Sequence, residues 1–136
     1  MATRKVKRFV IDVNCFVTLF INREADWILQ YVVKNKIEIF IDANLLAELT
    51  RVLEYPKIKK ILPLESFLYI KFVRVISTYV DVVPRNIKSP DPEDDYLFDL
   101  AICSNAKLLV TGEKALLGWN QSPVKVISLT QFKELF

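Results

Sequence analysis

Four acidic residues that are far apart in the sequence stand next to the expected ends of regular elements. Asp12 ends a short apolar run near the N-terminus, and Glu113 lies two residues beyond another such run. Asp95 stands in the first turn of an expected helix, and Glu48 stands in the helix after a third apolar run. Gathered carboxylates repel one another, so they persist where a cation compensates their charge. The pattern predicts a site for Mg²⁺ or Mn²⁺, ions that stabilise charge on a phosphate and activate water.

Each of these acids also has a purely structural interpretation. Asp12 could cap a helix that starts near Asn14. Asp95 belongs to an acidic run at 91–95, which the dipole of a helix N-terminus favours without any metal. Glu48 lies beside the apolar stripe of its helix, where an acid is unusual unless it borders a pocket. The combination of the four acids, rather than any one of them, favours the metal site.

The sequence has no histidine and two cysteines. The absence of histidine excludes Ser-His-Asp and Cys-His catalysis, and it leaves carboxylates, amides and thiols as metal ligands. Cys15 and Cys103 both stand in apolar contexts, which predicts buried, reduced thiols rather than a disulfide.

Alternating patterns predict the fold. Apolar runs predict strands at residues 9–11, 37–41, 80–83, 107–111 and 124–127. Helical spacing predicts a helix that Asp42 or Asn44 caps and Tyr55-Pro56 ends, and others at 14–20, 25–33, 64–79, 93–105, 114–117 and 129–136. This alternation is typical of an α/β fold, a three-layer α/β/α sandwich with a central parallel sheet. In such sheets the binding crevice lies beyond the carboxyl ends of the strands, where the strand order reverses.

Length and composition fit one domain over residues 1–136, with 52% hydrophobic residues and a net charge of +3. Basic residues cluster at 4–8 and 57–60 and acids at 91–99, an arrangement compatible with a polyanionic partner. No apolar run reaches the ~18 residues of a membrane span. The basic N-terminus leads into a stretch that Asp12 and Asn14 interrupt, so a secretory signal is not expected and the predicted location is cytoplasmic.

Four segments together resemble the PIN-domain family of nucleases, especially the branch that forms the toxin of toxin–antitoxin pairs. Each motif is weak alone, but the four occur in order at suitable spacing and the resemblance covers essentially the whole chain. The segments are Phe9-Val10-Ile11-Asp12-Val13-Asn14, Ala43-Asn44-Leu45-Leu46-Ala47-Glu48-Leu49, Asp91-Pro92-Glu93-Asp94-Asp95 and Leu109-Val110-Thr111-Gly112-Glu113.

The resemblance implies a central parallel sheet, dependence on Mg²⁺ or Mn²⁺, and hydrolysis of RNA. It also implies a homodimer and an antitoxin partner; no membrane association is expected, because no apolar run is long enough to span one. Asp12, Glu48 and Asp95 match the family's three core acids, and Glu113 matches a fourth that is usually Asp. In the hypothesis that follows, Asp12, Asp95 and Glu113 hold the metal, and Glu48 orients the attacking water or a second ion.

Three further residues enter the predicted site. Asn14 matches a polar residue that supports the first acid, and Thr111 matches a hydroxyl residue that lines the pocket, so both are predicted to contact substrate. Asp99 lies one helical turn after Asp95 on the same face and is a further candidate ligand.

Other functions stay open on the sequence alone. Val13 stands where the family commonly has Thr or Ser, and together with Glu113 it leaves room for a PIN-like domain that binds RNA or a protein without cleavage. Haloacid-dehalogenase-like phosphatases need a second Asp where this chain has Asn14. Receiver domains need an acidic pair at the first strand, where Asp12 is solitary. We therefore rank both below the nuclease.

Overall fold

The computed structural model describes residues 7–136, so most of the expected basic cluster at 4–8 lies outside the described residues. Five strands form one sheet in the order β3-β2-β1-β4-β5, and every neighbouring pair is parallel. The strands are β1 (Arg8–Ile11), β2 (Glu38–Ile41), β3 (Ser77–Tyr79), β4 (Leu108–Val110) and β5 (Lys125–Ile127). The predicted parallel sheet is confirmed.

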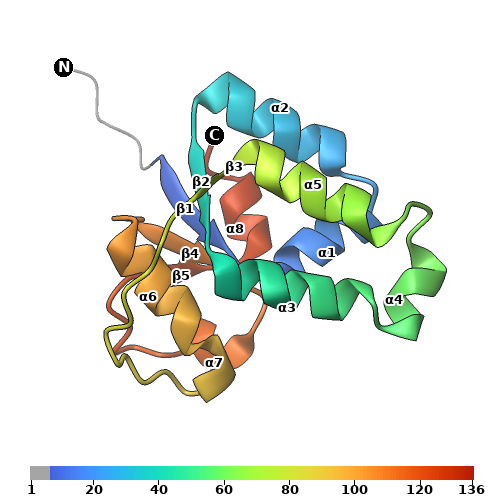
Figure 1. Ribbon diagram of the computed structural model, residues 1–136. Coiled ribbons are helices and arrows are strands. Elements are labelled where there is room, and N and C mark those ends of the chain that lie inside the picture. Colours follow the sequence, from blue (N-terminus) through green and yellow to red (C-terminus); the bar gives the residue numbers. More distant parts are fainter. Residues whose placement is uncertain (1–6) are drawn as a thin grey trace.

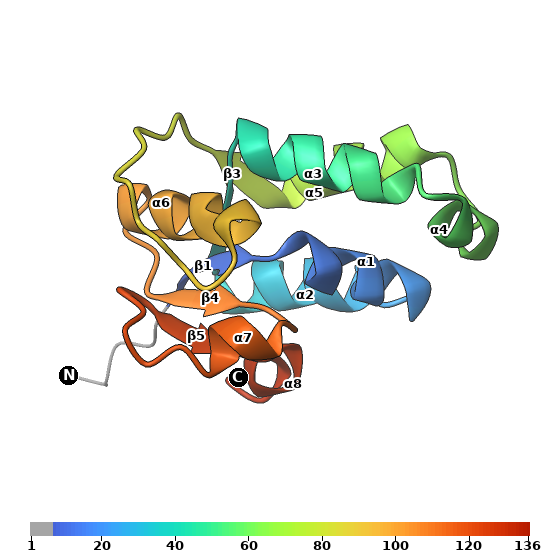
Figure 2. The same ribbon diagram turned by 90° about the horizontal axis from the view of Figure 1, so that it is seen from below.

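Helices cover both faces of this sheet and complete the three-layer α/β/α sandwich (Figures 1 and 2). They are α1 (Val13–Ile21), α2 (Ala25–Asn35), α3 (Ala43–Leu53), α4 (Pro56–Ile61), α5 (Ser66–Ile76), α6 (Asp95–Cys103), α7 (Lys114–Leu117) and α8 (Leu129–Lys133), with a 3₁₀ turn η1 (Pro92–Asp94) before α6. Among the described residues, no helix is both long enough and apolar enough to cross a membrane.

The central strand β1 is apolar because both of its faces are buried. Phe9, Val10 and Ile11 are each 0% exposed, which is the pattern of a parallel strand covered on both sides. Phe9 meets Phe132 of α8 edge to face, with ring centroids 5.0 Å apart, and α6 packs over β1, β2 and β4. The helices on both faces therefore hold the end of β1 rigidly.

One expected strand was misplaced, and one short helix was not expected. The third strand lies at 77–79 and not at 80–83, because α5 ends at Ile76 and the next residues pair directly with β2. Val83 of the expected strand is 73% exposed in a loop. The helix expected to end at Tyr55-Pro56 does end there, at Leu53, but a separate short helix that was not expected, α4, begins at Pro56, since proline is tolerated at the first position of a helix.

The topology determines where a site can form. From β1 the chain proceeds to β2 on one side, and from β3 it crosses over to β4 on the other side of β1. Strand order therefore reverses between β1 and β4, the position at which α/β sheets open a crevice. Asp12 and Thr111 are the residues that directly follow these two strands.

The two cysteines are free, as predicted, but only one of them is buried. Cys15 lies in the core on α1, whereas Cys103 at the end of α6 is exposed and directs its thiol toward the carbonyl oxygen of Asp81 at 3.4 Å. The prediction of burial was wrong for Cys103, because it is the last residue of α6 and does not belong to the buried face of that helix.

Candidate active site

Three acidic side chains meet at the crevice between β1 and β4. Asp12, Asp94 and Glu113 each offer a carboxylate oxygen, and these oxygens lie within 4.8 Å of one another. Asp12 follows β1, Glu113 follows β4 by three residues, and Asp94 ends the turn that leads into α6. Residues separated by most of the sequence therefore form one group, the acidic cluster.

Asp12 occupies the N-cap position of α1, but its side chain does not serve as the cap. Its carboxylate makes no capping hydrogen bond. Asp42 offers a direct comparison, because it follows β2 in the same way and is similarly buried, yet its Oδ1 accepts a bond of 2.8 Å from the backbone N–H of Leu45. The side chain of Asp42 therefore caps the helix that follows its strand, whereas the side chain of Asp12 does not.

Thr111 holds the carboxylate of Asp12 in place. Its fully buried hydroxyl donates to Oδ2 of Asp12 at 2.8 Å and accepts the backbone N–H of Glu113 at 3.1 Å. One hydroxyl thus connects two members of the acidic cluster. Because its side chain has no exposure, Thr111 is placed to position Asp12 rather than to touch a substrate.

Burial and mutual repulsion disfavour the charged forms of these acids. Loss of solvation raises the pKa of Asp12, and the charge of Glu113 raises it further, while the Thr111 hydroxyl opposes both effects. For Asp94 the same burial, together with the adjacent Glu113, raises the pKa to about 8. The cluster therefore carries more negative charge than its surroundings stabilise.

This imbalance predicts how the stability of the metal-free protein depends on pH. The pKa of Asp94 is raised from 3.8 to about 8, so the folded state binds this proton more tightly than the unfolded chain does. The stabilising contribution is then complete below about pH 4 and is lost as the pH rises through about 8. We expect the melting temperature, measured in chelator, to fall across this range more steeply for the wild type than for Asp94→Asn. If the melting temperatures of the two proteins changed with pH in parallel, Asp94 would not be the source of the pH dependence.

The donor set fits a divalent cation. Oδ2 of Asp94 is buried and has no hydrogen-bond partner among the described residues, so a buried oxygen acceptor is left unsatisfied. Three carboxylates supply only hard oxygen ligands, the kind that Mg²⁺ and Mn²⁺ prefer. A cation between them would satisfy the orphan oxygen and neutralise the repulsion at once.

Asp95 and Asp99, both predicted as metal ligands, do not join the cluster. Oδ1 of Asp95 accepts from the backbone N–H of Ser89 at 2.8 Å and from its hydroxyl at 2.6 Å. Oδ1 of Asp99 accepts the backbone N–H of Arg85 at 3.0 Å. The two acids do share a helix face, as expected, but that face binds the loop that precedes α6. Asp94 lies with Asp12 and Glu113 in the position that was predicted for Asp95.

The remaining predicted residues lie at the margin. Glu48 projects from α3 and forms an ion pair with Arg51, one turn along the same helix. It is not one of the three acids in mutual reach, although its charge acts on the nearby phenol of Tyr96 together with that of Asp12. Asn14 is exposed in the first turn of α1, and its backbone amide helps to stabilise the charge of Asp12.

Sequence patterns missed Asp94 for a definable reason. Asp91 accepts the backbone N–H of Glu93 at 3.0 Å and starts the 3₁₀ turn, so the α-helix begins at Asp95, two residues after the expected start at 93. The sequence feature that could have indicated this later start is the Asp-Pro pair at 91–92, which favours a turn before the helix.

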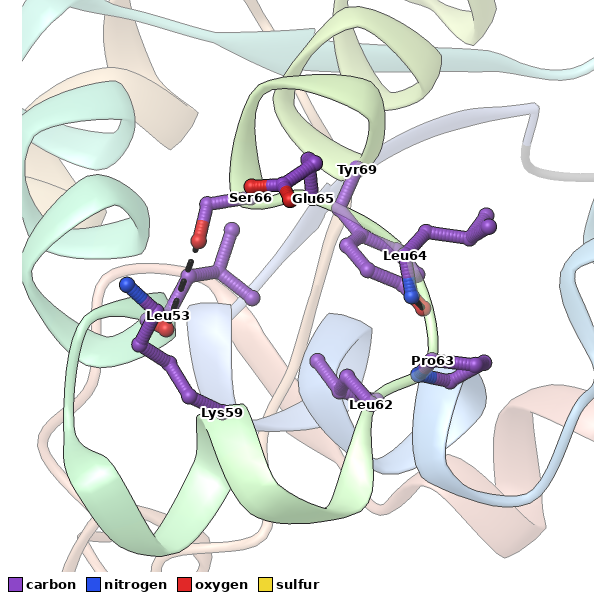
Figure 3. Close-up of a pocket in the computed structure, with 8 residues that line it drawn as sticks. All are labelled: Leu53, Lys59, Leu62, Pro63, Leu64, Glu65, Ser66 and Tyr69. Carbon is purple, nitrogen blue, oxygen red and sulfur yellow. Dashed lines mark hydrogen bonds between the residues drawn. The ribbon is translucent and has the colours of Figure 1, made fainter.

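A cavity outside the cluster has a different character (Figure 3). It has a volume of about 250 Å³ at the turn between α4 and α5, where the Ser66 hydroxyl reaches the Leu53 carbonyl at 3.5 Å. Glu65 is the only carboxylate among its eight lining residues, which are Leu53, Lys59, Leu62, Pro63, Leu64, Glu65, Ser66 and Tyr69. One acid does not provide the ligands of a metal site, so among these two places the cluster is the candidate for metal binding.

Comparisons with known proteins agree with this geometry. The family model described as PIN domain matches residues 8–115. Among solved structures, the fold is similar to a chain in the crystal structure of VapBC2 from Rickettsia felis bound to a DNA fragment from their promoter. The TM-score is 0.60 at 14% sequence identity, with 89% of this chain and 98% of that chain covered. No curated protein matches the sequence. At this identity the structural likeness supports the fold alone.

Proposed function

The chain belongs to the PIN-domain family, and from this premise we propose that it is a ribonuclease that hydrolyses RNA phosphodiesters with Mg²⁺ or Mn²⁺. The observation that carries the proposal is the acidic cluster at the point where the strand order reverses. A family match alone leaves activity open, because related folds also serve in binding. Three carboxylates in mutual reach, one with an unsatisfied oxygen, are costly to fold without a cation.

The roles follow from the contacts. Asp12, Asp94 and Glu113 would hold the cation, and Thr111 positions Asp12 through its hydroxyl. The bound ion would supply charge stabilisation for the phosphate and activation of water. Glu48 is proposed to orient the attacking water, which requires its ion pair with Arg51 to open.

The decisive experiment is a metal titration of RNA cleavage. Purified protein, first stripped with chelator, is mixed with labelled single-stranded RNA, and Mn²⁺ or Mg²⁺ is then added. We expect cleavage to appear only with the ion, and the same ions to raise the melting temperature by binding the folded state. An ion that stabilises the protein without any cleavage would favour a domain that binds RNA or a protein instead.

A partner protein is the second part of the proposal. The resemblance to the toxin branch and the fold shared with a chain of VapBC2 support an antitoxin that binds this chain. We further propose that the chain forms a homodimer in the cytoplasm, as the resemblance implies. The surface near α4 and α5 suits a protein contact, since Ile61, Leu64 and Phe67 are each more than half exposed. Co-purification with the product of the adjacent reading frame would test this pairing.

A further inference from the structure

An open groove lies beside the acidic cluster, between α3 and the start of α6. It has a volume of about 510 Å³ and is lined by Asn44, Ala47, Glu48, Arg51, Glu93 and Tyr96. The four residues from α3 are spaced three, four and seven positions from the first, so they share one helix face. Asp94 of the cluster lies between Glu93 and Tyr96 in the sequence, and these two residues line the groove on the side opposite α3. This α3–α6 groove therefore lies next to the cluster.

Tyr96 connects the two. Its half-buried side chain lines the groove, and its phenol is close enough to feel the charges of Asp12 and Asp94 as well as that of Glu48. A chain seated in the groove would pass this ring on its way to the cluster.

Arg51 is the one cation among the six lining residues. Its side chain is 55% exposed, and its partner Glu48 is also partly exposed, at 33%. Exposed ion pairs of this kind contribute little to stability. A guanidinium binds the oxygens of a phosphate through two parallel hydrogen bonds, so an incoming phosphate can replace the carboxylate of Glu48.

We propose that the α3–α6 groove holds the RNA strand beside the cleaved bond, and that Arg51 binds one backbone phosphate in exchange for Glu48. This inference rests on the proposed ribonuclease function. Glu48 and Glu93 repel a second phosphate, so the groove makes a single such contact, while the ring of Tyr96 offers a face for a base. The exchange releases Glu48 at the moment when substrate arrives.

The test measures binding without turnover. Labelled single-stranded RNA of about ten nucleotides is titrated with Asp12→Asn protein, and the dissociation constant is followed over a range of salt concentrations. Adding Arg51→Ala is expected to weaken binding about tenfold and to reduce the salt slope by about 0.7, the value for one phosphate contact on a single strand. Adding Glu48→Gln is expected to tighten binding a few-fold, because Arg51 loses its competing partner.

Arg74→Ala is the matched control, since Arg74 is an exposed arginine of α5 that does not line the groove. It is expected to leave both quantities unchanged. Stabilisation of the otherwise wild-type protein by Mn²⁺ is expected to persist in Arg51→Ala, because Arg51 is no ligand. If wild type cleaves RNA but Arg51→Ala changes neither affinity nor slope, the groove proposal is overturned and the ribonuclease stands. If wild type with Mn²⁺ cleaves no RNA, the function itself is overturned.

Discussion

Asp94→Asn is expected to lower metal-dependent RNA cleavage by a factor on the order of a thousand, whereas the neighbouring Asp95→Asn keeps most of the activity. The two residues are adjacent and of the same type, but only the carboxylate of Asp94 lies with Asp12 and Glu113. Asp95 is engaged with Ser89. Its replacement weakens a charged hydrogen-bond acceptor and is expected to cost about 1 kcal/mol of stability.

Two measurements on the same pair of variants separate chemistry from folding. Initial cleavage rates give the activity, and melting temperatures with and without Mn²⁺ give binding of the ion. Asp94→Asn should stay folded and lose its response to Mn²⁺, while Asp95→Asn should melt earlier and keep that response. The opposite assignment of the two phenotypes would return the metal site to Asp95 and refute the geometry of the cluster.

Asp12→Asn is expected to remove cleavage to a similar degree while preserving or raising the stability of the metal-free protein. The amide is nearly the same size as the carboxylate, and its oxygen can still accept the hydroxyl of Thr111. What disappears is a buried negative charge that repels Glu113, an unfavourable interaction in the absence of a cation. Activity and stability should therefore change in opposite directions, as rate assays and thermal unfolding can establish.

Asp42→Asn is the matched control for this variant. Asp42 follows the adjacent strand and is equally buried, but its carboxylate caps α3. Asparagine is also a strong N-cap, so we expect a small change in stability and nearly wild-type cleavage. Full cleavage by a carefully purified Asp12→Asn protein would be incompatible with the site proposed here.

The sequence could predict those site residues that are attached to strand ends. Asp12 and Thr111 stand where apolar runs stop, and a buried parallel strand must stop where its apolar residues do. Glu113 follows from the same logic on β4. The fold class came from the same alternation of elements, which does not depend on any exact boundary.

Asp94, which lies in the turn before α6, could not be predicted in this way. Each residue along a helix turns the side chain by about 100°, so a start displaced by one position redirects every acid in the run. The start of α6 depends on the 3₁₀ turn that Asp91 and Pro92 initiate. Contacts between α6 and the preceding loop then decide which carboxylate faces the cluster. The local sequence pattern contains no information about these contacts.

The position of β3 has a similar explanation. Val80, Val82 and Val83 have strand-forming side chains, but pairing with β2 had already begun at Ser77. Partner strands, which a local pattern does not reveal, determined the register.

The bonds from Asp95 and Asp99 to the loop at 85–89 have one more consequence. This crossover has no regular structure, yet side chains of α6 fasten it at two of its backbone amides. Asp94 is therefore already ordered when the protein folds. The conformational entropy lost in ordering it opposes folding and does not oppose binding of the ion. The cation therefore meets a ligand that is already ordered, which favours tight binding.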